Sequence, residues 1–227
     1  TTYNRPDALL LVLRSIEEQR TLPYEVIIAD DGSTNHTKEV VTSFQEKSDI
    51  RVIHSWQEDN GFRAAKSRNK AISQSNSDYI VLIDGDVILH PEFINDHINN
   101  AQPSYFVQGS RVLLTENKTK QALDQQKINF SLLSNGLQNR KNAIHSNSLS
   151  RLFSNKKNTL RGIKSCNLAF FKQDFISVNG FNNEFEGWGR EDSEFIMRLL
   201  NSGINRKNVR FNAIQFHLWH NENIRSS

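Results

Sequence analysis

The stretch that decides the fold is Tyr79-Ile80-Val81-Leu82-Ile83-Asp84-Gly85-Asp86. Its apolar first part predicts a buried strand, which ends at two acids separated by one glycine. Acids at a strand end lie at the carboxyl edge of a sheet, where open α/β folds bind ligands. Hard carboxylate oxygens at that edge suit Mg²⁺ or Mn²⁺, and such an ion can hold a diphosphate. Taken alone, the Asp-Gly-Asp triplet is also typical of an ordinary turn after a core strand.

The first half of the chain alternates predicted strands with predicted helices. Strands are expected at 25–29, 50–54 and 79–83, and helices at 37–44, at 64–72 and from Pro6 onward. This alternation predicts an α/β fold with a parallel, Rossmann-like sheet and right-handed crossovers. A length of 227 residues is consistent with a single domain.

The second half is less regular. The pattern predicts a helix at 91–98, a strand or strand pair at 105–114, and further strands at 167–172 and 209–219. The segment 115–161 is rich in Asn, Lys, Gln and Ser and carries no strong strand signal. We interpret it as a helix plus a mobile loop, which is either a functional lid or a variable surface insertion.

Composition narrows the class of protein. The formal net charge is +3, and Lys and Arg do not cluster as they do on a nucleic-acid-binding stripe, so no nucleic-acid partner is expected. Cys166 is the only cysteine, which excludes an intrachain disulfide and fits a reducing compartment. No apolar run approaches the roughly 20 residues that span a bilayer, and the sequence shows no pattern from which a signal peptide is expected. We therefore expect a cytoplasmic protein, with room for peripheral contact at the inner face of the membrane.

A second motif, Gly187-Trp188-Gly189-Arg190-Glu191-Asp192-Ser193-Glu194, lies near the carboxyl terminus. The residues 195–200 that follow it predict an amphipathic helix, so the acids lie in its first turn. The helix dipole favours acids there, which is one explanation of the cluster. The other is a general base at the mouth of a pocket, with Trp188 as a flat platform for an acceptor ring.

Four stretches occur in a specific order: Thr1-Thr2-Tyr3-Asn4-Arg5-Pro6, Ala29-Asp30-Asp31-Gly32-Ser33, Asp84-Gly85-Asp86 and Gly187 to Asp192. In this combination the chain resembles a family 2 glycosyltransferase of the GT-A fold. Its carboxyl-terminal half is similar to the β-1,4-galactosyltransferase type. The resemblance implies one mixed, mainly parallel sheet flanked by helices. It divides the chain into a nucleotide-sugar-binding half at 1–114, a variable insertion at 115–161, and an acceptor and catalytic half at 162–227.

The resemblance also implies which residues hold the donor. Asp31 is expected to contact the base, although an Asx-turn explains the Asp30-Asp31 pair as well. Thr2 and Tyr3 are expected to line the same pocket, mostly through their backbone. Arg63 and Lys66 are expected near the uracil or the phosphates. The resemblance allows the same placement for Arg68 on this predicted helix, but for Arg68 a solvated helix face is the favoured interpretation.

Metal and catalytic residues follow from the same resemblance. Asp86 is implied as the direct metal ligand, and Asp84 faces the ribose or a metal-bound water. His217 and His220 match the spacing of two further ligands, with two ordinary histidines as the alternative. The remaining two acids are Asp192, implied as the general base, and Glu191, implied as a contact to the donor or acceptor sugar.

The implied activity is an inverting, Mn²⁺- or Mg²⁺-dependent transfer of a hexosyl or N-acetylhexosaminyl group. The donor is a UDP-sugar and the acceptor a hydroxyl of a glycan or glycolipid, with bacterial surface polysaccharide or lipooligosaccharide synthesis as the expected setting. Two alternatives remain. A sugar-phosphate nucleotidyltransferase shares the sheet and the acids but has a Gly- and Arg-rich phosphate loop, unlike Thr2 to Pro6. A non-catalytic carbohydrate-binding module could use the tryptophans, but such modules are usually all-β.

Overall fold

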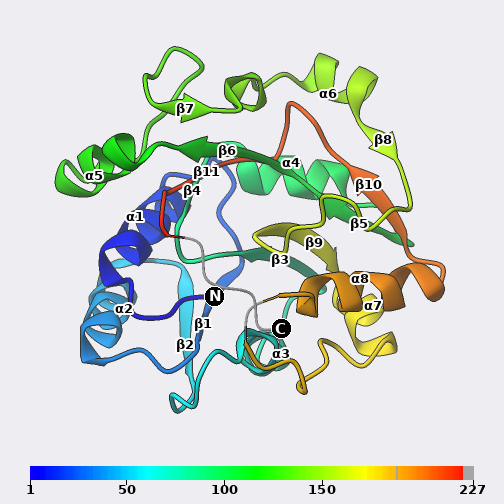
Figure 1. Cartoon of the computed structure of the whole chain (residues 1–227), viewed down its shortest axis with the longest axis horizontal. Helices are drawn as coiled ribbons and strands as arrows, with labels where there is room; N and C mark the ends of the chain where they lie inside the picture. The colour runs from blue at the N-terminus through cyan, green and yellow to red at the C-terminus, as the bar shows by residue number, and fades with distance from the viewer. Residues whose placement is uncertain (188, 222–227) are drawn as a thin grey trace.

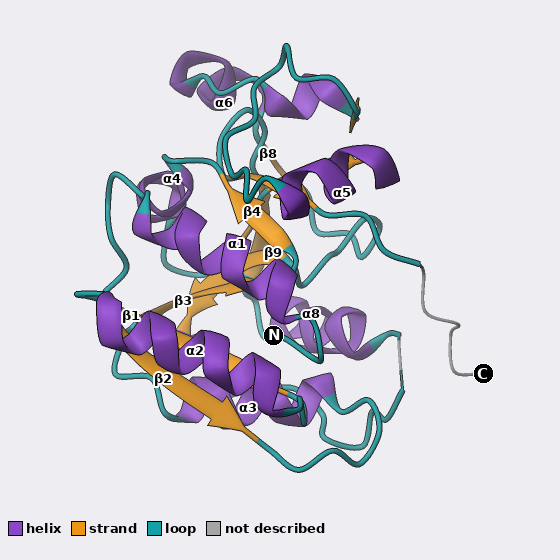
Figure 2. Ribbon diagram, turned by 90° about the vertical axis from the view of Figure 1, so that its left-hand side faces the viewer, coloured by secondary structure: helices purple, strands orange, loops and turns teal. Residues whose placement is uncertain are grey.

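A computed structural model describes residues 1–187 and 189–221 of the chain. It confirms the α/β class, with mixed sheets flanked by helices (Figure 1). The first layer is a parallel pair of strands, β1 (Glu25–Asp30) and β2 (Arg51–Trp56), paired from Glu25 opposite Arg51 to Asp30 opposite Trp56. Figure 2 shows α2 (Asn35–Lys47) and α3 (Ala64–Ser73) on either side of this pair.

Two further sheets complete the strand arrangement. The first has the strand order β3 (Tyr79–Ile83), β9 (Asn167–Phe171), β5 (Tyr105–Gln108), β10 (Asn205–Asn208) and β8 (Asn155–Lys156). The second has the order β4 (Val87–Leu89), β11 (Ile214–His217), β6 (Ser110–Leu114) and β7 (Leu137–Gln138). The other helices are α1 (Pro6–Glu17), α4 (Phe93–Asn100), α5 (Glu116–Asp124), η1 (Arg140–Ala143), α6 (Asn147–Phe153), α7 (Lys172–Ser177) and α8 (Glu191–Asn201).

Antiparallel pairing is more extensive than the expected mainly parallel sheet. Among the strands of the described residues, only β1–β2, β5–β10 and β6–β11 pair in parallel, whereas β9 runs antiparallel to both β3 and β5. The predicted strand at 209–219 is shorter, because Phe211 and Ala213 have left-handed backbones that interrupt it. The insertion 115–161 contains the short strands β7 and β8 besides its helices.

The amino-terminal residues join the first two sheets. Thr2 forms a parallel bridge with Asp30, and its amide donates to the carbonyl of Ala29. The amide of Gly85 donates to the carbonyl of Thr1 at 2.6 Å. A Cβ at Gly85 would lie 2.9 Å from that carbonyl, so only glycine allows the approach. The tips of β1 and β3 are thereby held side by side.

Helix α1 packs between two hydrophobic clusters. Leu9, Leu13 and Ile16 contact the cluster that reaches α2 and β1, while Ala8 and Leu11 contact the cluster beneath β4, β6 and β11. Pro6 begins this helix, where its missing N–H has no intrahelical acceptor to lose. Within the described residues, no helix is both long and apolar enough to cross a bilayer.

Asn167, which is 1% exposed, connects α4 with both larger sheets. Its Nδ2 donates to the carbonyls of Ser110 and Ala213 at 2.9 and 2.8 Å. Its Oδ1 lies 2.9 Å from Nε2 of His97, a fully buried side chain on α4. Burial lowers the pKa of His97 to about 4, so the imidazole is neutral in the folded protein at neutral pH.

This buried histidine predicts that acid weakens the fold. Below the ordinary histidine pKa of about 6.5, the unfolded chain takes up a proton that the folded form excludes. We expect His97 to contribute a loss of about 2 kcal/mol in the free energy of unfolding between about pH 7 and about pH 5. Burial also lowers the pKa of His90 to about 4, so His97→Gln should reduce the pH dependence measured by urea unfolding without abolishing it. Exposed His36→Gln is the control, and equal profiles for all three proteins would contradict the assignment.

Candidate active site

A cavity of about 1600 Å³ opens where the tips of β1, β3 and β11 meet the beginning of α8. It gathers nine of the residues predicted from the sequence: Thr2, Tyr3, Asp31, Asp84, Asp86, Glu191, Asp192, His217 and His220. These residues come from both ends of the chain, so the predicted motifs form one site in space. Their individual roles remain predictions.

Three predicted residues are not among those that line this cavity. The guanidinium of Arg63 turns to the carbonyl of Glu58, although the Arg63 backbone amide donates to Asp31. Lys66 is exposed on α3. Trp188 lies outside the described residues. Arg63 therefore contacts the site through its main chain, and its placement differs from the expectation that its side chain faces the nucleotide.

Asp86, His217 and His220 form a cluster at one wall of the cavity, and their ligand atoms all lie within 4.8 Å of one another. Oδ1 of Asp86 is 3.5 Å from Nε2 of His217, and Oδ2 is 3.4 Å from Nε2 of His220. The local fold explains the meeting, because His217 pairs with Val87, the residue after Asp86. Among the described residues, Oδ1 of Asp86 has no hydrogen-bond donor.

Two features around this cluster affect the charges of its members: a neighbouring arginine and the burial of His217. Arg5 places Nη1 3.2 Å from Oδ2 of Asp86, so one carboxylate oxygen already faces a cation. Burial lowers the pKa of His217, and the nearby Asp86 carboxylate opposes that shift. A lowered pKa keeps the imidazole neutral, which is the form that binds a metal ion. The cluster is thus a carboxylate and two imidazoles directed at one point.

Asp31 lies at the tip of β1, 4% exposed, with both carboxylate oxygens engaged. Gln57 donates to Oδ1 at 2.5 Å and the Arg63 amide donates to Oδ2 at 2.6 Å. Burial raises the pKa of Asp31, and these two hydrogen bonds oppose the rise. A carboxylate held this rigidly can accept a further N–H from a ligand in the cavity, since its oxygens have spare lone pairs.

The first turn of α8 contributes the other acids. Arg190 precedes it with a left-handed backbone, and the first residue, Glu191, is 8% exposed. Burial raises the pKa of Asp192, and the adjacent Glu191 carboxylate raises it further. The Ser193 amide donates to Oδ1 of Asp192 at 2.7 Å. A carboxylate with a raised pKa is a better proton acceptor near neutral pH.

Arg68 was expected on a solvated helix face, and that interpretation is wrong. It is 5% exposed and lines the cavity. Its Nη1 donates to Glu191 at 3.0 Å, and its Nη2 lies 3.5 Å from Oδ1 of Asp84. Its Nε donates to the hydroxyl of Thr1 at 3.2 Å. A single guanidinium therefore joins the β3 tip to the start of α8.

Sequence reasoning also missed two cations of the cavity wall, Arg111 on β6 and Lys164 before β9. Neither lies in a recognisable motif, so the sequence alone offered no signal. Arg5 could have been found, because it belongs to the amino-terminal stretch that carried the family resemblance. The sequence thus located the acids of the site better than the cations around them.

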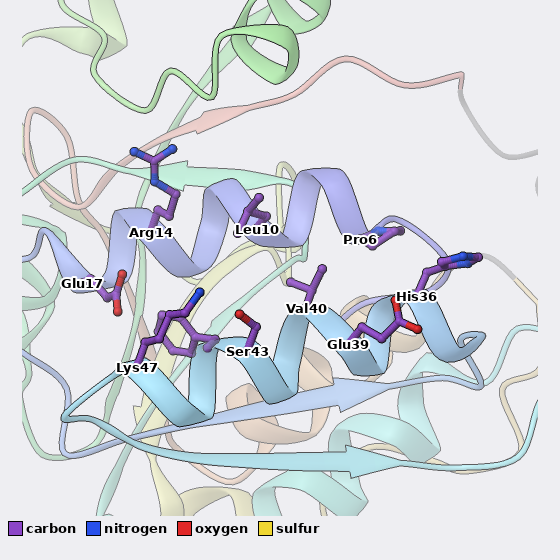
Figure 3. A pocket seen from close by; sticks show the side chains of 10 residues that line it. Pro6, Leu10, Arg14, Glu17, His36, Glu39, Val40, Ser43 and Lys47 are labelled. Carbon is purple, nitrogen blue, oxygen red and sulfur yellow. The ribbon is translucent and has the colours of Figure 1, made fainter.

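A second hollow of about 680 Å³ lies between α1 and α2. Figure 3 shows Leu10 and Val40 near its centre, with charged side chains such as Glu17 and Lys47 at one end. None of the predicted site residues lines it. The acidic cavity is therefore the stronger candidate for the chemistry.

Comparison with known proteins identifies the family. The family described as "Glycosyl transferase family 2" matches residues 1–173. The chain belongs to glycosyltransferase family 2. A second family, described as "N-terminal domain of galactosyltransferase", matches residues 148–221. The two matches together cover the amino-terminal and carboxyl-terminal motifs that the sequence singled out.

Curated relatives agree with this assignment. The chain is 29% identical to hyaluronan synthase of Pasteurella multocida, over 89% of this chain and 22% of that protein. It is 26% identical to chondroitin synthase of Escherichia coli, over 95% of this chain and 33% of that protein. It is 27% identical to validoxylamine A glucosyltransferase of Streptomyces hygroscopicus subsp. limoneus, over 89% of this chain and 47% of that protein. The chain thus spans less than half the length of each of these relatives.

Solved structures share the fold. S. aureus TarS 1-349 in complex with UDP-GlcNAc superposes with a TM-score of 0.67 at 19% identity, over 98% of this chain and 58% of that one. Mannosyltransferase PcManGT from Pyrobaculum calidifontis, in complex with GDP-Man and Mn2+, superposes with a TM-score of 0.65 at 16% identity, over 96% of this chain and 55% of that one. At these identities the likeness establishes the fold.

Because Arg68 is buried, we expect its substitution to lower the stability of the fold, whereas substitution of the exposed Lys66 should not. Removing one partner of a buried ion network leaves uncompensated charge, so Arg68→Met should lower the free energy of unfolding by about 3 kcal/mol. Lys66→Met, on the same helix but exposed, is the matched control and should change it by less than about 0.5 kcal/mol. Urea unfolding measures both, and equal effects of the two substitutions would contradict the bridging role.

Proposed function

We propose that this chain transfers a sugar from a UDP-sugar to a glycan hydroxyl, with a divalent metal ion and inversion at the anomeric carbon. The observation that carries this is the grouping of Asp86, His217 and His220 in one cavity with Asp31 and Asp192. Such a cavity offers a metal centre, a base contact and a proton acceptor within one site. UDP-GlcNAc in the TarS complex supports a UDP-sugar donor, and GDP-Man in the Pyrobaculum complex supports a nucleotide sugar more generally.

The described residues fit a metal ion. Oδ1 of Asp86 is buried without a donor, and both imidazoles direct Nε2 toward that carboxylate. Mixed carboxylate and imidazole ligation favours Mn²⁺ over Mg²⁺, which prefers oxygen alone. When bound, the ion neutralises the charge that develops on the leaving diphosphate. The Mn2+ in the complex of the Pyrobaculum mannosyltransferase supports this choice.

The residues of the cavity then have distinct tasks. Asp31 accepts the uracil N–H, and Thr2 and Tyr3 form the adjacent wall. Asp192 accepts the proton of the acceptor hydroxyl. At the same time the hydroxyl oxygen bonds to the anomeric carbon, and the bond between that carbon and the diphosphate breaks. Glu191, tied to Arg68, fixes the start of α8 so that Asp192 keeps its position. A single base fits direct displacement with inversion.

The setting of the reaction belongs to the same proposal. The names of the curated relatives, hyaluronan synthase and chondroitin synthase among them, support a polysaccharide acceptor in surface polysaccharide synthesis. The two earlier alternatives fit less well. The family assignment favours transfer of a sugar over synthesis of the activated sugar, and the α/β fold disfavours a carbohydrate-binding module.

A donor screen tests the proposal. The protein is incubated with Mn²⁺ and UDP-glucose, UDP-galactose, UDP-GlcNAc or UDP-GalNAc, and UDP release is measured. One donor should be hydrolysed well above the others, and thermal stability should rise most with UDP and Mn²⁺ together. Absence of both UDP release and stabilisation by UDP with Mn²⁺ would reject it. Anomeric configuration of a transferred product, read by NMR, decides between inversion and retention.

Loss of a metal ligand should raise the metal concentration that the protein needs. Asp86→Ala should abolish turnover together with Mn²⁺-dependent UDP binding, since it removes the only carboxylate of the cluster. His220→Ala and His217→Ala should each weaken Mn²⁺ binding by about 10–100-fold or more. Mn²⁺ titration by calorimetry in the presence of UDP measures the affinity, with His36→Ala on α2 as the control. Unchanged Mn²⁺ affinity in both histidine variants would show that His217 and His220 are not metal ligands.

The general base has its own test. Asp192→Asn keeps the shape of the side chain but cannot take up the proton, so transfer should slow by about 10²–10⁴-fold. Donor affinity should change little, because this carboxylate faces the acceptor. Transfer rates and UDP-sugar binding are measured on the same variant. A large loss of donor binding with a modest loss of rate would place Asp192 in the donor site instead.

A further inference from the structure

The insertion 115–161 carries a strong excess of positive over negative charge. It holds nine lysines and arginines against two acids, a net charge of +7, whereas the whole chain has +3. The remainder of the chain is therefore acidic, with a net charge of −4. Figure 1 shows this segment, from α5 through β7 and α6 to β8, running along one edge of the molecule. We call it the basic edge.

Most of the cations of the basic edge are exposed, although the ammonium of Lys156 lies 4.1 Å from the centroid of the Tyr105 ring. Eight of the nine are exposed: Lys120, Lys127, Arg140, Lys141, Arg151, Lys156, Lys157 and Arg161. Within residues 1–187 and 189–221, none of them lies within 4.0 Å of a carboxylate in an ion pair. Their charge is therefore not neutralised by the fold, and it is available to an external anion.

Large apolar side chains are exposed on the same edge. Leu133 is 85% exposed and Leu152 is 73% exposed, with Phe153 at 47% and Leu132 at 38%. Arg151, Leu152 and Phe153 are consecutive at the end of α6, so a cation and two apolar groups are presented together. Apolar groups rimmed by cations are the composition of segments that lie in the interface of an anionic membrane.

The fold holds part of this surface in place. The ring of Phe153 packs edge-on against Phe211, with centroids 5.7 Å apart. The guanidinium of Arg210 lies over the Phe211 ring at 5.5 Å, and Arg210 itself is exposed. The connection between β10 and β11 thus supports the end of α6 and adds a cation beside it. A supported surface loses less conformational entropy on binding than a flexible loop.

We propose that the basic edge is an interfacial membrane-binding surface that takes anionic phospholipid. The cations attract the headgroups and the exposed leucines and Phe153 enter the interface. A soluble polyanion would need the cations but would leave the apolar side chains in water, so the exposed leucines favour lipid. This surface requires neither the metal cluster nor the sugar-transfer reaction.

Sedimentation with vesicles tests the proposal. The protein should pellet with vesicles of phosphatidylcholine mixed with phosphatidylglycerol and stay in solution with phosphatidylcholine alone, and added salt should weaken binding. The charge variant Arg151→Gln/Lys156→Gln/Lys157→Gln should lose about fivefold in partition coefficient per cation. The apolar variant Leu133→Ser/Leu152→Ser should lose at least about tenfold.

Matched controls lie on α2 and before β1, away from the basic edge. Lys38→Gln/Lys47→Gln removes two exposed cations, and Leu22→Ser removes a leucine that is 51% exposed. Both should bind vesicles as the parent protein does. Equal binding to neutral and anionic vesicles, or unchanged binding of both edge variants, would overturn the proposal. Binding of dextran sulfate without any vesicle binding would also overturn it and would assign the edge to a polyanionic glycan.

Discussion

The buried guanidinium of Arg68 is the constraint on which the geometry of the site depends. A charge that is 5% exposed is tolerated only where acids and hydrogen-bond acceptors surround it. Arg68 meets that condition with Asp84 and Glu191, two acids far apart in sequence, and with the hydroxyl of Thr1. Each partner is therefore fixed relative to the others. As a result, the carboxyl end of β3 and the first turn of α8 face the same cavity.

The rest of the cavity wall follows from backbone pairing around this point. Thr1 and Thr2 lie between the tips of β1 and β3, so Asp31 and the Asp84-Gly85-Asp86 turn share one edge. Strand β11 pairs antiparallel with β4 directly after that turn, which brings His217 to Asp86. The meeting of Asp86 and His217 therefore follows from backbone pairing. It results from strand ends that other hydrogen bonds have already aligned.

The sequence predicted those parts of this arrangement that have a local signal. Strands 25–29, 50–54 and 79–83 are rich in β-branched residues, and the acids at the ends of the first and third located the cavity. Strand β10 gave no such signal, because Asn205–Asn208 is polar and its place is set by pairing with β5. Burial of Arg68 was also beyond the sequence, since it depends on Glu191, 123 residues away. Local pattern reveals strands and acids, but not which cation the completed fold will enclose.

Two groups of cations in this protein differ in how the fold treats their charge. Arg68 and Arg5 have acids within 3.5 Å, so the fold itself neutralises them and uses them to position Asp84, Asp86 and Glu191. The exposed cations of the basic edge have no such partners among the described residues, and they repel one another across a segment of net charge +7. Such self-repulsion opposes folding unless salt or a bound anion screens it. An anionic partner would relieve this repulsion, which is the physical reason to look for a ligand of the edge outside the chain.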